Sequence, residues 1–542
     1  MLKDEKGRML CNFDVCVEGV DEVCIIGKDR TFSQIHIRLL FDENDSSPIF
    51  TVIESELERI SWSDLDERCC LNPDISLTKI KRYLANSIRL QKKNASRKRV
   101  YQLSSTGISI IGREAVFCTG LEVIKASTSN ISDMIIGQRL MNSHLDIDIS
   151  ISEPQVVSEM FDLVSLSPNP GRILWAHKLL YIMRQAYIDA GVKPNVCIYL
   201  YGSSGTNKTT FASFLTQMYN RREGINSPVR LNASIASAVQ ILLDVSDDVI
   251  VFDDLFPVES KQIRRHQEET LIEITRYVAD GITPARMNGR KISKNTPKCG
   301  VVFTGEYLIG NGSNAARLLA VEMIQPNGEK LKYFQDHPLV VSTFYYFYIR
   351  WFVENYKEIV GVLSEWLNRY RKINLGVHKR LQETHFFLNT AYAMLMQYCY
   401  EKNLMEKSDI CRLQSSFGDL LTKLVKKQNE RTQMTVKNEQ QCKNYWECFQ
   451  MLYLSGQILI ADNVGQFNEK LHDGLIHRKC LYFRGNKIMT YFPNASINDL
   501  VDELVSQGVL ETGKGSNTKQ ISTLKGKRFY VIPLNLLDKG NK

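Results

Sequence analysis

The chain has 542 residues, enough for about three to four domains, and its 44% hydrophobic and 24% charged content is that of ordinary soluble globular protein. A net charge of +8 is modest for this length, which excludes a polycation and leaves any attraction for nucleic acid to local basic clusters. Thirteen cysteines without a CxxC pair, and an N-terminus without the apolar core of a signal peptide, favour a reducing, cytoplasmic setting.

Residues 1–150 alternate short apolar runs with polar breaks, which predicts a mixed α+β, strand-rich N-terminal domain with one helix near 77–92. Residues 79–102 contain nine Lys or Arg and no acid. Such a run is either a solvated helix face with its loop or, because no acid within it neutralises the charge, a nucleic-acid contact.

Three further regions follow from changes in the sequence pattern. Residues 151–335 contain helical patterns near 154–164 and 171–190 and then alternate strand-like and helix-like segments over 196–323, which predicts an α/β core. Residues 336–440 are predicted to be helical, and residues 441–542 to form a last domain. The most apolar stretch, 338–353, is shorter than the roughly 20 residues of a membrane span and contains Arg350, so we expect a buried helix and no transmembrane segment.

The segment "GSSGTNKTT" at 202–210 follows the apolar strand pattern "VCIYLY" and precedes a helical pattern. This is the order of a phosphate-binding P-loop, in which Lys208 reaches the β- and γ-phosphates and the Thr209 hydroxyl binds Mg²⁺. Asn207 stands where Gly usually precedes the Lys, and Asn is one of the few other residues that visit left-handed backbone angles. The predicted ATP-binding residues are Gly202, Ser203, Ser204, Gly205, Thr206, Asn207, Lys208, Thr209 and Thr210.

Three later elements complete a predicted ATPase site. The run "DDVIVFDDLF" is a buried strand ending in Asp253, expected to hold Mg²⁺, and Asp254, expected to polarise the attacking water. The strand "CGVVFTGEYL" ends in Thr304, the position that contacts the γ-phosphate or water in ring ATPases, called sensor 1. Arg317 precedes the last expected core strand and is either an arginine finger for a neighbouring subunit's ATP or a local ion pair. The order and spacing of all four elements fit an AAA+ core.

Two basic hairpins are candidates for DNA contact. Between the Asp253 strand and the Thr304 strand lies an amphipathic helix, followed by Asn288-Gly289, a strong hairpin signal. In a ring this hairpin projects into the central pore, where basic residues neutralise phosphates, although an ordinary surface hairpin is the alternative. Its basic residues are Arg286, Arg290, Lys291 and Lys294.

The C-terminal domain has a helix pattern over 496–508, with a capping box from Ser496 to Asp499, followed by two strands around a Gly- and Lys-rich loop. This is the pattern of a winged helix, a module that binds DNA or protein. Residues 512–532 contain no acid and five candidate DNA contacts: Lys514, Lys519, Lys525, Lys527 and Arg528.

The stretches "YLYGSSGTNKTTFASF", "VFDDL", "MNGRK", "VVFTGEYL" and "NAARLLAVEM" together resemble the AAA+, MCM-like replication initiator helicases of bacterial mobile elements, such as staphylococcal cassette chromosomes and pathogenicity islands. The resemblance covers mainly 196–323. It implies a hexameric ring that uses ATP and Mg²⁺ to translocate on DNA, with Lys208, Asp254, Thr304 and Arg317 as catalytic residues and Thr209 and Asp253 at the metal. Asn207 and Asp254 depart from the commonest patterns of these helicases. We expect these two departures to affect the rate of ATP hydrolysis more than nucleotide binding.

The sequence therefore predicts an ATP-dependent DNA helicase that initiates replication of its own element and acts on single-stranded and forked DNA and on an origin duplex. Two alternatives stay open: an ATP-switched DNA-binding regulator without unwinding, and a protein-remodelling AAA+ ATPase. The hairpin tip disfavours the second alternative, because pores that grip polypeptide usually carry an aromatic residue next to a glycine.

Overall fold

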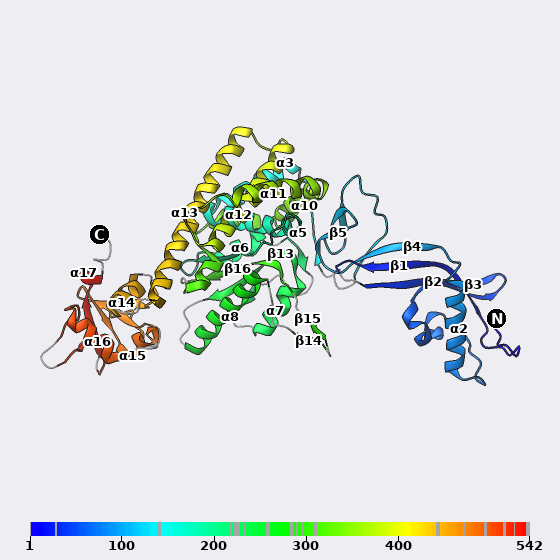
Figure 1. The fold of residues 1–542 in the computed structure, drawn as a ribbon, viewed down its shortest axis with the longest axis horizontal. Coiled ribbons are helices and arrows are strands. Elements are labelled where there is room, and N and C mark those ends of the chain that lie inside the picture. Colours follow the sequence, from blue (N-terminus) through cyan, green and yellow to red (C-terminus); the bar gives the residue numbers. More distant parts are fainter. Residues whose placement is uncertain are drawn as a thin grey trace. The chain divides into compact units, whose positions relative to one another are not determined.

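The computed structural model describes residues 2–27, 30–137, 143–216, 218–221, 228–231, 234–255, 261–281, 286–288, 291–293, 296–306, 312–440, 445–454, 456–469, 472–492, 496–512, 516–524 and 526–537. The chain forms two compact units (Figure 1). The first consists of residues 1–145, 219–222 and 349–356, and the second of the remaining residues. In the described part of the chain, no helix is both long and apolar enough to cross a membrane.

The first unit is built on a five-stranded sheet in the order β3-β2-β1-β4-β8. Helix α2 (Leu77–Gln91) begins at the capping residue Ser76 and buries Ile80, Leu84 and Ile88 against this sheet (Figure 1), as the pattern over 77–92 predicted. A second, three-stranded sheet has the order β5-β6-β7. The strands are β1 (Asp14–Ile25), β2 (Arg30–Asp42), β3 (Asp45–Ile53), β4 (Arg97–Leu103), β5 (Gly107–Ile111), β6 (Glu114–Cys118), β7 (Val123–Lys125) and β8 (Met134–Ile136).

The basic run of 79–102 is partly neutralised by acids that lie outside it in the sequence. Five of its nine cations make ion pairs: Lys79 with Asp4, Arg89 with Glu58, Lys92 with Glu54, Arg97 with Glu22 and Lys98 with Asp133. The expectation that the run has no neutralising neighbours was therefore wrong, because the fold supplies carboxylates from other strands and turns. The nucleic-acid interpretation of this run loses its main support.

The second unit contains a parallel five-stranded sheet in the order β12-β13-β16-β10-β17. Its strands are β10 (Cys197–Tyr201), β12 (Val229–Arg230), β13 (Ser246–Leu255), β16 (Lys298–Gly305) and β17 (Leu318–Glu322). The middle strands are apolar and buried because helices cover both faces of a parallel sheet. These helices include α3 (Glu153–Ser165), α4 (Pro168–Ile182), α5 (Arg184–Asp189), α6 (Lys208–Thr216), α7 (Ile235–Asp244) and α8 (Lys261–Asp280). The predicted alternation of strand and helix is confirmed.

Strand β13 begins with two buried carboxylates that pair with cations from helices α4 and α5. Lys178 and Asp248 form one pair, and the Arg184 Nε lies 2.6 Å from the Asp247 Oδ1 in the other. Lys178 is fully buried, and Asp247 is 1% exposed. A buried charge without its partner is strongly destabilising, so these pairs hold α4 and α5 to the start of β13.

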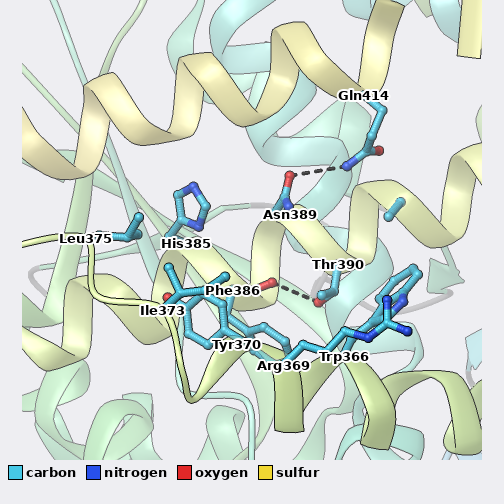
Figure 2. A pocket seen from close by; sticks show the side chains of 11 residues that line it. Trp366, Arg369, Tyr370, Ile373, Leu375, His385, Phe386, Asn389, Thr390 and Gln414 are labelled. Carbon is cyan, nitrogen blue, oxygen red and sulfur yellow. Dashed lines mark hydrogen bonds between the residues drawn. The ribbon is translucent and has the colours of Figure 1, made fainter. Parts of the chain in front are cut away.

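Residues 328–440 are helical, as expected, with α9 (Gly328–Asp336), α10 (Leu339–Glu354), α11 (Tyr356–Tyr370), α12 (Lys379–Glu401) and α13 (Lys407–Gln440). Helices α12 and α13 run side by side (Figure 1). An apolar pocket of about 410 Å³ lies among α11, α12 and α13, with Trp366, Tyr370 and Phe386 in its wall (Figure 2). In its wall, the Gln414 Nε2 donates a hydrogen bond to the Asn389 Oδ1 at 3.2 Å (Figure 2).

The C-terminal segment forms a small sheet in the order β18-β19-β20-β22-β21 with helices α14 (Tyr445–Leu454) and α16 (Ile497–Ser506). The capping box of Ser496 and Asp499 is present at the start of α16, as predicted. The strands are β18 (Ile460–Ala461), β19 (Gly474–His477), β20 (Cys480–Phe483), β21 (Lys519–Gln520) and β22 (Arg528–Pro533). The winged-helix assignment and the four-domain division stay predictions.

An unusual turn joins β19 to β20. Its two residues, Arg478 and Lys479, have φ angles of +48° and +61°. Positive φ at both positions is the signature of a type I′ turn, which normally uses Asn-Gly. Long side chains in this region cost about 1–2 kcal/mol per residue.

Candidate nucleotide-binding site

The loop at 202–207 connects buried strand β10 to helix α6, the arrangement of a phosphate-binding loop. Gly205 has φ +80° and Asn207 has φ +55°, so both positions require the left-handed region. Asn tolerates this region better than other non-glycine residues because its short polar side chain can hydrogen-bond locally. The departure at Asn207 is therefore compatible with the loop conformation. The loop is joined to β16 by the Gly202 N–H, which donates to the Gly305 carbonyl at 3.2 Å.

The Lys208 side chain folds back into the loop. Its Nζ donates to the carbonyl oxygens of Gly202 and Ser203 at 2.9 and 2.8 Å, and the residue is only 9% exposed. Burial lowers the pKa of the Lys208 ammonium, and the nearby carboxylates of Glu306 and Asp253 partly oppose this shift. An anion bound in the loop would stabilise the charged form further. Lys208 is thus positioned where a phosphate could replace two carbonyl contacts.

Three side chains from three different elements meet beside this lysine. The Thr209 hydroxyl donates to the Asp253 Oδ1 at 2.5 Å and lies 3.1 Å from the Thr304 Oγ1, which also donates to Asp253. Strand β16 lies between β10 and β13 in the sheet, so Thr304 at its end reaches both the loop and the carboxylate. The structure therefore brings together Lys208, Thr209, Asp253 and Thr304, as the sequence predicted.

An irregularity in β13 sets the position of the two acids. Phe252 pairs with Phe303 and Leu255 pairs with Gly305, so Asp253 and Asp254 together lie opposite the single residue Thr304. An extra residue of this kind bends a strand and re-aims its side chains, and such bulges are frequent next to active sites. Asp253 is directed to Thr209 and Thr304. The side chain of Asp254 lies outside the described residues, so its predicted role is untested.

The residues present fit ATP with Mg²⁺. Mg²⁺ prefers oxygen ligands and usually takes one or two protein groups together with substrate phosphates, and the Thr209 hydroxyl and the Asp253 carboxylate provide such oxygens. Among the described residues there is no group of three or more His, Cys, Asp or Glu that could hold a metal by itself. Ser203, Ser204, Gly205 and Thr210 are exposed at the loop and the start of α6, whereas the Thr206 hydroxyl donates to the Ser203 carbonyl at 2.9 Å.

Arg317 lies at the other edge of the sheet. Leu318 pairs with Cys197 and Glu322 pairs with Tyr201, so Arg317 precedes the start of β17 while the P-loop follows the end of β10. The span from Leu318 to the level of Tyr201 is about 13 Å at 3.3 Å per residue. The Arg317 Nη2 lies 3.5 Å from the Asp280 Oδ2, and the Arg380 Nη2 lies 3.1 Å from the Asp280 Oδ1. The local ion pair is thus present, and the role of Arg317 in a neighbouring site stays a prediction.

Sequence reasoning missed three residues around the site. Asp280, which bridges Arg317 and Arg380, is the last residue of α8 and gave no signal because its partners are distant in sequence. Glu306 follows Thr304 by two residues at the end of β16, which could have suggested its place near Lys208. The guanidinium of Arg431, on α13, lies 5.8 Å from the centre of the Tyr201 ring, next to the first glycine of the loop.

The hairpin after α8 is present, with β14 (Arg286–Asn288) antiparallel to β15 (Lys291–Ser293). Asn288 pairs with Lys291, so Asn288 belongs to the first strand, whereas the Asn288-Gly289 signal placed it in the turn. The side chains of Arg286 and Lys291 lie outside the described residues, as do Arg290 and Lys294 altogether. Their predicted DNA contacts are therefore untested.

The basic residues of the C-terminal segment are partly neutralised. The Nζ atoms of Lys519 and Lys527 lie 2.6 Å from Glu511 and 2.5 Å from Glu469. The range 512–532 contains no acid, but the fold brings Glu511 and Glu469 from outside that range to two of its lysines. Arg528 is exposed at the start of β22, while Lys514 and Lys525 lie outside the described residues. DNA contact by these five residues stays a prediction.

Comparisons with known proteins connect the fold to helicases. No family model and no curated protein matches the chain. A solved structure described as "SCCmec type IV Cch - active helicase" has a TM-score of 0.52 and 14% identity, with 96% of this chain and 94% of that chain covered. The apo C-terminal region of NrS-1 has a TM-score of 0.29 and 11% identity, with 95% and 96% covered. A JCV helicase structure has a TM-score of 0.22 and 14% identity, with 44% and 74% covered. The first likeness shows a shared fold.

Proposed function

We propose that the chain is an ATP-dependent DNA helicase that assembles as a ring and initiates replication of a mobile genetic element. The observation that carries this proposal is the meeting of Lys208, Thr209, Asp253 and Thr304 at one edge of a parallel sheet, in a fold shared with a helicase. Neither part is sufficient by itself, because a P-loop indicates nucleotide binding only and a shared fold does not determine an activity.

The four residues have separate roles in this reaction. The Lys208 ammonium exchanges the carbonyls of Gly202 and Ser203 for oxygens of the β- and γ-phosphates, while backbone N–H groups of the loop face the phosphates. The Thr209 hydroxyl and the Asp253 carboxylate supply oxygen ligands to Mg²⁺, which when bound offsets the phosphate charge. The Thr304 hydroxyl, fixed by Asp253, orients the attacking water, and Asp254 accepts its proton.

Among the described residues, Lys208 is the cation that contacts the loop carbonyls, and Arg431 lies beside Tyr201 at the start of the loop. A ring would add a further cation from a neighbouring subunit on the γ-phosphate side. Arg317 directly precedes β17, whose start is aligned with the start of β10, so it lies at the opposite edge of the sheet from its own loop, where a neighbouring subunit could receive it. An arginine supplied in this way stabilises transition-state charge and typically contributes 10³–10⁵ in rate. The β14–β15 hairpin then contacts the DNA strand in the pore.

The test is a fork-unwinding and ATPase assay of the full chain, with and without single-stranded DNA, beside a mass measurement of the assembly. We expect single-stranded DNA to stimulate hydrolysis, a forked duplex to be separated, and Lys208→Ala to abolish both. Hydrolysis that never separates a fork, at any nucleotide or salt concentration, would exclude the helicase and favour an ATP-switched DNA-binding regulator. The replication role is tested by preferential binding to DNA that flanks the protein's own gene over a shuffled duplex.

A further inference from the structure

The turn between β19 and β20 carries two adjacent cations in an unusual backbone conformation. The strands pair antiparallel from Gly474 opposite Phe483 to His477 opposite Cys480, which leaves Arg478 and Lys479 as the whole connection. Five non-glycine residues in the described part of the chain have positive φ. Three of them are Asn or Asp, which tolerate this region, and Arg478 and Lys479 are the other two.

Neighbouring structure holds the turn in place. The Leu534 N–H donates to the Lys479 carbonyl at 3.0 Å, and Cys480 pairs with Pro533 on the next strand. Strain that is kept at an exposed site by its surroundings is a reason to look for a function there. A tight turn without a functional demand on its side chains would take Asn-Gly.

The two cations are also free of local carboxylates. Both are exposed, and neither makes an ion pair with any residue that the structure describes. Glu511, the acid beside Cys480, is bonded by Lys519, and Glu469 is bonded by Arg484 and Lys527. These two acids therefore neutralise other cations and not the turn.

The turn lies away from the loop that the sequence indicated for DNA contact. Cys480 is opposite Pro533, whereas Arg528 begins the same strand five residues earlier, which is about 17 Å along the strand. The turn is thus distinct from Arg528, whereas Lys519, another predicted DNA contact, lies close enough to Cys480 to interact with it electrostatically.

We propose that Arg478 and Lys479 form a contact for the phosphate backbone of DNA. The inference rests on the proposed function, which supplies DNA as the partner. Two adjacent exposed cations on a short, well-held turn suit phosphates. Arg alone would also suit a protein interface, but Lys is depleted at the centres of such interfaces. Such contacts add affinity without sequence preference and release counterions.

The test replaces the turn by its ideal sequence, Arg478→Asn with Lys479→Gly, in the full chain. This double variant relieves the backbone strain while removing both charges, so the melting temperature should rise by about 2–4 °C while DNA binding weakens. Each lost phosphate contact lowers the slope of log affinity against log salt concentration by about 0.9. Losing two contacts therefore predicts about 60-fold weaker DNA binding at 0.1 M salt and no difference near 1 M. Binding is measured without nucleotide over a salt series, on single-stranded and on duplex DNA, to show which form uses the turn.

Two controls make the outcome decisive. Arg478→Gln with Lys479→Gln removes the charges without changing the backbone demand, and it should weaken binding equally with no gain in melting temperature. Lys402→Gln with Arg412→Gln removes two exposed charges, one just after α12 and one in the early part of α13, where Arg412 pairs with Asp409, and should change affinity less than twofold. If the wild type binds DNA but both turn variants bind with the same affinity and salt slope, the turn is not a DNA contact and the proposal is wrong. If the wild type binds no DNA at any salt, the proposed function itself fails.

Discussion

Asn207 offers a direct test of how backbone strain enters nucleotide binding. Its φ of +55° lies in the left-handed region, where an ordinary L-residue such as alanine costs about 1–2 kcal/mol. If the loop must keep this conformation to hold phosphates, Asn207→Ala should weaken nucleotide affinity by about 5- to 30-fold, which is the same free energy expressed as a ratio of Kd values. Asn207→Gly should bind within about twofold of the wild type, because glycine adopts positive φ freely.

The assay is a titration of each purified variant with a fluorescent ATP analogue, beside a thermal melt. The chain offers a matched control: Asn403, exposed at the end of α12, has φ +53° and lies in another part of the sequence. Asn403→Ala should lower the free energy of unfolding by the same cost of about 1–2 kcal/mol and leave the Kd for the ATP analogue unchanged. If Asn207→Ala binds as tightly as the wild type, or if Asn207→Gly binds less tightly than Asn207→Ala, the backbone argument is refuted. If both variants lose the same affinity, the Asn side chain itself makes the contact.

Three further predictions concern the same unit. Thr304→Val should retain nucleotide binding but lower hydrolysis by roughly 10²-fold, the loss typical of one pre-positioned donor, and equal turnover would exclude Thr304 from the chemistry. Arg317→Ala and Lys208→Ala should each be inactive but regain part of the ATPase activity when mixed, because an interface can then combine an intact arginine with an intact loop; no recovery would place Arg317 outside the neighbour's site. Asp248→Ala should lower the free energy of unfolding by about 3–5 kcal/mol in a denaturant titration, against less than about 0.5 kcal/mol for exposed Asp244→Ala.

The parts of the site that were predictable from sequence are those that depend on local order. A buried strand, a glycine-containing loop and a helix follow one another over 197–216, and the ends of neighbouring parallel strands necessarily share one edge of the sheet. This is why Lys208, Thr209, Asp253 and Thr304 could be placed together, although their chemical roles are still untested. The left-handed angle at Asn207 also followed from local reasoning.

The parts that were not predictable depend on residues distant in sequence. The ion pairs of Lys519 with Glu511 and of Lys527 with Glu469 are set by sheet pairing, so an acid-free window in the sequence did not mean an un-neutralised surface. The turn at Arg478 and Lys479 could not be predicted, because its sequence has no Asn-Gly signal and the turn is enforced by strand pairing on both sides. The hairpin within 286–293 was found, but Asn288 belongs to its first strand and not to the turn, since a turn signal gives the place of a hairpin more reliably than its register.

The sequence of β13 reads almost the same from either end: two aspartates, four apolar residues and two aspartates, Asp247-Asp248 and Asp253-Asp254. Nothing local distinguishes a structural pair from a functional one. The difference comes from Lys178 and Arg184, which neutralise the first pair inside the protein and so determine how far the strand extends before its second pair emerges. A shift of one residue would replace Asp253 opposite Thr209 by Phe252 in one direction and by Asp254 in the other. Lys178 and Arg184 lie at the start of β13, at the opposite end of the strand from the P-loop. These two buried cations therefore set the register that places Asp253, the predicted metal ligand, beside Thr209.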